Sequence, residues 1–142
     1  MKVRELMSKP IIRIHANEPV SVAARTLTHY NIGALPVCTQ DGKLCGVLTD
    51  RDIVTRCLAA DRDLHNTKVS DVMTSQVQWV DADADATLAA HIMGSKQVRR
   101  LPVVEDGRLC GMLSLGDLAN SEPNAYDAAD ALTEITSNIS HR

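Results

Sequence analysis

The feature that most constrains this chain is an internal repeat. A shift of 65 aligns DGKLCGVLTDRDI (residues 41–53) with DGRLCGMLSLGDL (residues 106–118), with seven identities in thirteen positions. Such clustering indicates a tandem duplication, so the chain must fold into two similar units. Further upstream a shift of 66 brings identical residues together without a gap, at Val3/Val69, Met7/Met73, Ala16/Ala82, Ala23/Ala89, Ala24/Ala90, Leu35/Leu101, Pro36/Pro102 and Val37/Val103.

The first part of each repeat changes from a strand pattern to a helix pattern. Residues 11–14 and 77–80 are short runs rich in β-branched residues, which predict strands. Apolar residues at positions i, i+3, i+4 and i+7 then predict a helix. These residues are Val20, Ala23, Ala24 and Leu27 in the first repeat and Ala86, Ala89, Ala90 and Met93 in the second.

The second part of each repeat predicts a hairpin followed by a helix. The strand ALPVC or RLPVV is followed by an Asp-Gly turn and a second strand, LCGVL or LCGML. A helix is expected to begin at Thr49 or Ser114, and in the first repeat its predicted apolar face is Ile53, Val54, Cys57 and Leu58. The order strand-helix-strand-strand-helix, twice, predicts a mixed α/β (α+β) fold.

The repeat also predicts the domain organisation. We expect a first domain at 1–60, a polar linker at 61–68, a second domain at 69–120 and a tail at 121–142. Each repeat has about 60 residues, a size at which a single core is marginal, so the two small sheets should pack as a pseudo-two-fold pair. The tail is predicted to form an amphipathic helix. Three arrangements of this helix are open: it folds back on its own unit, packs across a dimer or docks a target protein. Its apolar stripe is Ala128, Ala131, Leu132, Ile135 and Ile139.

Composition excludes several classes of function. Aromatic residues are 2% of the chain and the net charge is −3, which together disfavour nucleic acid as a partner. No apolar run approaches the roughly 18 residues that span a bilayer, and the first residues lack the apolar core of a signal peptide. We therefore expect no membrane partner and a cytoplasmic location.

No pattern typical of an enzyme or of a metal site is present. The four cysteines form no Cys-x-x-Cys pair, and the histidines are scattered, so neither a disulfide framework nor a metal site is predicted. No Ser-His-Asp or Cys-His order accompanies a recognisable nucleophile turn, so no hydrolase-type catalytic site is predicted. We expect a non-catalytic protein that requires no cofactor.

The strand-to-helix junction of each repeat is the candidate binding site. Its hydroxyl residue occupies a helix N-cap, where unpaired N–H groups favour an anion such as phosphate. The Asp three residues later can accept hydrogen bonds from vicinal hydroxyls. Gly46 and Gly111 let a ligand or a neighbouring strand approach closely. The alternative is a capping box, a local device that stabilises the start of a helix.

These motifs resemble the CBS-domain family, in particular its small bacterial stand-alone pairs. The likeness covers residues 3–120 and includes GVLTDRD (46–52), GMLSLGD (111–117) and VRRLPV (98–103). The resemblance implies that the hydroxyl residue contacts phosphate, that the last Asp holds ribose hydroxyls and that CBS pairs form homodimers. The predicted nucleotide-binding residues are Gly46, Thr49, Asp50, Arg51, Asp52, Arg100, Gly111, Ser114 and Asp117.

The resemblance predicts a regulatory sensor of adenine nucleotides. AMP, ADP and ATP are the first candidate ligands, and NAD or S-adenosylmethionine come second. The motif at Thr49–Asp52 is the stronger of the two, because Leu115 and Gly116 replace a charged pair in the second, which depends on Arg100. The alternative is a structural or protein-interaction module that binds no nucleotide and responds to redox state through Cys38. A target protein of this sensor is expected but not identified.

Overall fold

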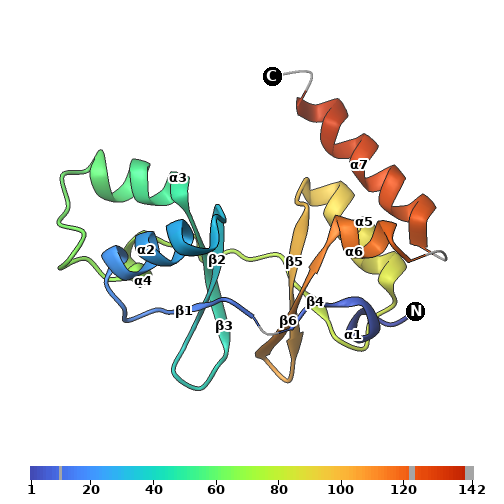
Figure 1. Ribbon diagram of the computed structural model, residues 1–142, viewed down its shortest axis with the longest axis horizontal. Helices are drawn as coiled ribbons and strands as arrows, with labels where there is room; N and C mark the ends of the chain where they lie inside the picture. The colour runs from blue at the N-terminus through green and yellow to red at the C-terminus, as the bar shows by residue number, and fades with distance from the viewer. Residues whose placement is uncertain (10, 122–123, 140–142) are drawn as a thin grey trace. The chain divides into compact units, whose positions relative to one another are not determined.

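The computed structural model describes residues 1–9, 11–121 and 124–139. These residues form two compact units, one comprising Ile12–Val77 and the other Met1–Ile11 together with Gln78–Arg142 (Figure 1). Each unit contains one three-stranded sheet, with the orders β1-β2-β3 and β4-β5-β6. The predicted mixed α/β fold, built from two small sheets and their helices, is therefore confirmed.

The unit Ile12–Val77 contains most of the first repeat. Strand β1 pairs parallel to β2, and β2 pairs antiparallel to β3 as the predicted hairpin. The helix after β3 begins as an α-helical turn and continues as a π-helix. The elements are β1 (Ile14–His15), α2 (Val20–Tyr30), β2 (Ala34–Cys38), β3 (Leu44–Thr49), α3 (Asp50–Asp52), η1 (Ile53–Leu58) and α4 (Val69–Val72).

The other unit contains most of the second repeat and the tail. Its strands repeat the same parallel and antiparallel pairing. Figure 1 shows α5, α6 and α7 gathered at one side of the hairpin β5-β6. The elements are α1 (Val3–Leu6), β4 (Val80–Asp81), α5 (Ala86–Lys96), β5 (Arg100–Glu105), β6 (Arg108–Ser114), α6 (Leu115–Ala119) and α7 (Ala125–Ile139).

The short helices α1 and α4 lie in the opposite units from those that sequence order suggests. The Val3 amide donates to the Ala84 carbonyl at 2.9 Å, beside the second repeat, and the Val69 amide donates to the Glu18 carbonyl at 2.9 Å, beside the first. Val3 and Val69 are both fully buried. The compact units therefore have different boundaries from the sequence repeats.

Each unit has its own aliphatic core, as a chain without Phe requires. In the unit Ile12–Val77 the core includes Val20, Leu35 and Leu48. In the other unit it includes Ala89, Met93 and Leu101. The helical spacing predicted for α5 is confirmed, because its four predicted core residues, Ala86, Ala89, Ala90 and Met93, are all buried.

Two local predictions differ from the structure. The strands expected at 11–14 and 77–80 are shorter and lie later, at β1 and β4. On the helix after β3, Ile53 and Cys57 are buried as predicted, but Val54 and Leu58 are 54% and 52% exposed. Of the four residues of this predicted face, only Ile53 and Cys57 are among the buried residues of η1.

The tail forms the predicted amphipathic helix and packs on its own unit. Helix α7 contacts α5 and α6 (Figure 1), and its residues Ala128, Ala131 and Ile135 are buried. Leu132 is 40% exposed, and the side chain of Ile139 lies outside the described residues. Of the three arrangements expected for the tail, the structure shows the fold-back.

Candidate functional site

The two repeated motifs form equivalent strand-to-helix turns. At the first turn, the Asp52 amide donates to Thr49 Oγ1 at 3.0 Å and the Thr49 amide donates to Asp52 Oδ2 at 3.1 Å. At the second, the Asp117 amide donates to Ser114 Oγ at 3.0 Å and the Ser114 amide donates to Asp117 Oδ2 at 2.8 Å. Both turns are thus complete capping boxes, so the local alternative considered from the sequence is present in both repeats.

The carboxylate of Asp52 is surrounded by further polar groups. Besides the Thr49 amide, Asp52 Oδ2 accepts a hydrogen bond from Thr74 Oγ1 at 3.4 Å. Arg56 Nε lies 3.9 Å from Asp52 Oδ1, and Arg56 Nη1 also donates to the Met73 carbonyl at 3.0 Å. Asp52 is 8% exposed. Its two carboxylate oxygens are therefore both adjacent to protein donors.

The carboxylate of Asp117 is less enclosed. At the positions equivalent to the arginine and threonine beside the first carboxylate, the second repeat has Ser121 and Ser8. Among the residues that the structure describes, the Ser114 amide is the only group that donates a hydrogen bond to this carboxylate. Asp117 is partly exposed. Its second oxygen is available to another donor.

Arg100 lies beside the second motif. It is the register partner of Ser114 across the hairpin β5-β6, and its side chain is exposed. Arg100 is thus opposite Ser114 in the hairpin, and Ser114 caps the turn that contains Asp117. The role of the three residues in binding stays a prediction. The structure also places Asp117 in an open environment that the sequence did not indicate.

Asp50 and Arg51 lie at the first turn with Thr49 and Asp52, and both are exposed. The Asp50 amide donates to the Gly33 carbonyl at 3.0 Å, and Asp50 Oδ1 accepts from the Arg51 amide at 2.8 Å. The structure thus gathers all four predicted polar residues of the first motif in one turn. Their role in binding stays a prediction.

The two motif glycines provide space for neighbouring chain segments. A Cβ added to Gly46 would lie 2.5 Å from Met73 Sδ and 2.9 Å from the Thr74 carbonyl oxygen. A Cβ added to Gly111 would overlap Met7 Sδ. The structure therefore supports the neighbouring-segment alternative for both glycines, with a packing role for each. Ligand contact by either glycine stays a prediction.

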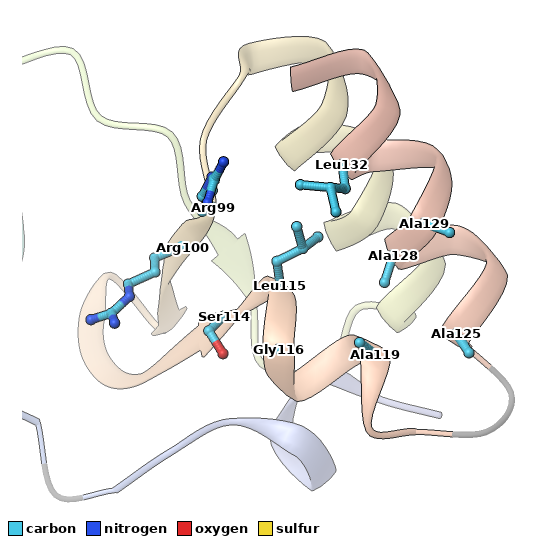
Figure 2. A pocket seen from close by; sticks show the side chains of 10 residues that line it. All are labelled: Arg99, Arg100, Ser114, Leu115, Gly116, Ala119, Ala125, Ala128, Ala129 and Leu132. Atoms are coloured by element: carbon cyan, nitrogen blue, oxygen red, sulfur yellow. The ribbon is translucent and has the colours of Figure 1, made fainter. Parts of the chain in front are cut away.

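A cavity of about 650 Å³ lies at the second motif (Figure 2). Arg99, Arg100 and Ser114 provide its polar groups, and no carboxylate is among the lining residues that the structure describes. Figure 2 shows Leu115 of α6 and Leu132 of α7 between the two helices, with Arg100 extending away from them. The remaining lining residues are small, namely Gly116, Ala119, Ala125, Ala128 and Ala129. The cavity thus joins a cationic end to an apolar wall.

Sequence reasoning did not identify Leu115 and Leu132 as lining residues of this cavity. The apolar stripe of the tail showed that Leu132 needed a neighbour, but three neighbours were compatible with it. In the sequence, Leu115 only stands where the first motif has a charged residue. The two leucines are 17 positions apart, and only the docking of α7 on its own unit brings them to one cavity.

Burial disfavours the thiolate form of three cysteines. Burial raises the pKa of Cys38, Cys45 and Cys110, and for Cys38 the positive charge of Arg13 opposes this effect in part. Within the described ranges, no group of three or more His, Cys, Asp or Glu side chains is arranged to hold a metal ion. No helix in those ranges is both long and apolar enough to cross a membrane.

Comparison with known proteins identifies related sequences and folds. A family model described as "CBS domain" matches residues 3–59 and 69–123. The protein YhcV of Bacillus subtilis, a CBS domain-containing protein, is 37% identical over 140 residues, which are 99% of this chain and 96% of that protein. Hypoxic response protein 1 of Mycobacterium tuberculosis is 35% identical over 120 residues, which are 84% of each chain.

Two crystal structures extend these similarities. Hypoxic response protein I with two coordinated zinc ions has a TM-score of 0.78 at 34% identity, covering 87% of this chain and all (100%) of that one. The CBS domain pair of MJ0100, in complex with 5′-methylthioadenosine and S-adenosyl-L-methionine, has a TM-score of 0.70 at 30% identity. It covers 84% of this chain and 94% of that one. The resemblance in the sequence is thereby confirmed.

Proposed function

The chain belongs to the family of CBS domain proteins, and from this premise we propose that it is a non-catalytic regulatory module that binds an adenosyl compound at its second motif. The observation that carries the proposal is the cavity beside Arg100 and Ser114. The MJ0100 pair, 30% identical, holds two adenosyl compounds. Adenine and ribose are common to those compounds and to AMP, ADP and ATP.

The chemistry of the second motif suits the parts of such a ligand. Asp117 is not among the lining residues of the cavity but shares a capping box with Ser114, which lines it, and its free oxygen can accept a hydrogen bond from a ribose hydroxyl of a ligand that extends to this turn. Arg100 and the hydroxyl of Ser114 can donate to phosphate oxygens, and a guanidinium matches phosphate in a bidentate manner. The apolar wall of the cavity suits the faces of adenine. AMP, ADP and ATP would use all three parts, which favours them over ligands without phosphate.

We place the site at the second motif rather than the first because of the two aspartates. A ligand hydroxyl at Asp52 would have to compete with Thr74 and Arg56, whereas at Asp117 it would meet an open oxygen. Breaking hydrogen bonds between protein groups to make new ones yields little net binding free energy. The first motif has the charged pair Asp50 and Arg51, but this pair does not remove the cost of displacing Thr74 and Arg56 from Asp52.

The redox alternative has less support. The thiolate, not the thiol, reacts with oxidants and disulfides. Because burial raises the pKa of Cys38, the reactive form of this residue is scarce near neutral pH. An adenosyl sensor is therefore the function that we retain. The homodimer, the target protein and the cytoplasmic location stay predictions.

Thermal unfolding and calorimetric titration with AMP, ATP and S-adenosylmethionine test the proposal. Ligand that binds the folded state raises the melting temperature with increasing concentration. Asp117→Asn should weaken binding by about tenfold, since it removes a charged acceptor worth about 1.5–3 kcal/mol, while its amide oxygen can still accept from Ser114. Arg100→Ala should weaken the binding of AMP and ATP more than the binding of S-adenosylmethionine.

Two matched variants act as controls. Asp52→Asn makes the same change in the first motif, and Arg108→Ala removes an exposed arginine at the far end of the same hairpin. Both should bind with nearly wild-type affinity. Loss of binding in Asp52→Asn but not in Asp117→Asn would move the site to the first motif. Absence of binding by every compound would refute the adenosyl function.

A further inference from the structure

We propose that α7 is part of the ligand site, with Leu132 contacting the apolar part of the bound compound, so that ligand binding and the docking of α7 favour each other. This inference rests on the proposed function and extends it to a segment beyond residue 123, where the match to the family model ends. Helix α7 begins at Ala125. Helix α7 therefore lies outside the part of the chain that the family model matches.

Helix α7 forms part of the wall of the cavity. Four of its ten lining residues, Ala125, Ala128, Ala129 and Leu132, come from α7. Ala128 is buried, but Leu132 is 40% exposed although it lies on the apolar stripe of the helix. Figure 2 shows Leu132 and Leu115 between α7 and α6. An apolar ring placed there would cover surface of both leucines, which is favourable in water.

The position of α7 depends on close packing against α5, away from the cavity. A Cβ added to Gly94 would lie only 3.2 Å from Ala131 Cα and 2.9 Å from Glu134 Oε2, so this glycine allows the two helices to approach. Thr87 Oγ1 donates to Asp127 Oδ2 at 3.3 Å on the same side. None of these residues lines the cavity. The wall is thus held by contacts that a ligand does not touch.

Coupling follows from this arrangement. A compound that contacts Ser114 and Leu115 on one side and Leu132 on the other binds more tightly when α7 is docked. By linkage, the compound must favour the docked helix by the same factor. A change that displaces α7 should weaken binding even when every lining side chain is unchanged.

Calorimetric titration with AMP and with S-adenosylmethionine tests the contact. Leu132→Ala should weaken the binding of each by about fivefold, the loss expected for part of one apolar side chain. The matched control is Leu88→Ala, because Leu88 is a 49% exposed leucine of α5 that does not line the cavity. Gly94→Ala should weaken binding through the position of α7 alone.

Hydrogen exchange of residues 125–137 tests the coupling. Saturating AMP should slow exchange of this segment in the wild type, but not in Asp117→Asn at a concentration that leaves that variant unoccupied. The inference is overturned if AMP binds and Asp117→Asn weakens it, yet Leu132→Ala binds as tightly as Leu88→Ala and exchange of α7 does not change. If neither compound binds the wild type, the proposed function and this inference fail together.

Discussion

Asp52 and Asp117 occupy equivalent positions in the two repeats, but their carboxylates have different neighbours. Both accept a hydrogen bond from the amide of the capping residue three positions earlier. Arg56 and Thr74 then approach Asp52 only. The same motif therefore has a different environment in each repeat. At the residue scale, the surrounding side chains decide which carboxylate has an oxygen open to a ligand.

The motif glycines give a prediction at the same scale. Gly46→Ala should destabilise the protein by about 1–3 kcal/mol, the usual cost of overpacking, because the new Cβ meets a backbone oxygen, that of Thr74, at 2.9 Å. Gly111→Ala should cost less, since its nearest neighbours belong to the flexible side chain of Met7. Urea unfolding of the two variants measures both changes. Equal costs would contradict this difference between a backbone neighbour and a flexible side chain.

At the scale of elements, the short helix α1 is held to its unit by charged side chains. Arg4 Nε donates to Asp83 Oδ1 at 2.8 Å and Arg4 Nη2 donates to Glu105 Oε1 at 2.7 Å. These bonds lower the pKa of Asp83 below its ordinary value and raise that of Arg4. All three side chains are well exposed. Their contribution is therefore modest and depends on salt.

The lowered pKa of Asp83 predicts a dependence on pH. A carboxyl whose pKa is lower in the folded state stabilises that state fully above its unfolded pKa of about 3.9. The contribution disappears as pH falls through the lower folded value. The difference in unfolding free energy between the wild type and Asp83→Asn should therefore be constant from pH 5 to 7 and decrease below about pH 4. Urea unfolding across this range measures it.

The control for this pH series is Asp106→Asn, which changes an exposed aspartate in the β5-β6 turn. Asp83→Asn should lose more of its difference from the wild type on acidification than this control, because Arg4 pairs with Asp83. An Asp83→Asn difference that grows on acidification would contradict the assigned ion pair, because the sign of the linkage would be reversed.

At the scale of the whole molecule, the chain exchanges the segments that begin its two repeats. Met1–Ile11 joins the unit of the second repeat, and the residues around α4 join that of the first. Val3 and Val69 are the buried anchors of these segments. Each unit is therefore completed by residues about 66 positions away from those that the repeat would assign to it.

Val3→Ala and Val69→Ala test this exchange as a matched pair. Each removes buried methyl groups and should cost about 2 kcal/mol, the lost burial plus a small cavity. Val3→Ala should increase hydrogen exchange in β5 and β6, although Val3 stands at the start of the chain. Val69→Ala should increase it in β2 and β3. The reverse assignment, with Val3→Ala acting on β2 and β3, would refute the exchange.

The sequence alone determined the strand-helix-strand-strand-helix order of each repeat, the two hairpins, both capping turns and the amphipathic tail, but not the short helices α1 and α4. Each predicted feature depends on residues within a few positions of one another: the alternation of ALPVC and LCGVL, the Asp-Gly turns and the spacing of Thr49 to Asp52. The family resemblance added the candidate ligand. The resemblance did not predict which residues contact each candidate site residue.

Only the tertiary structure decided which unit α1 and α4 complete, that Arg56 and Thr74 enclose Asp52, and that α7 closes a cavity beside Ser114. The duplicated motifs are nearly equal as sequences, so their local patterns could not distinguish the open carboxylate from the enclosed one. These features depend on contacts between residues far apart in the chain. Such contacts are set by how whole elements pack, which no local spacing records.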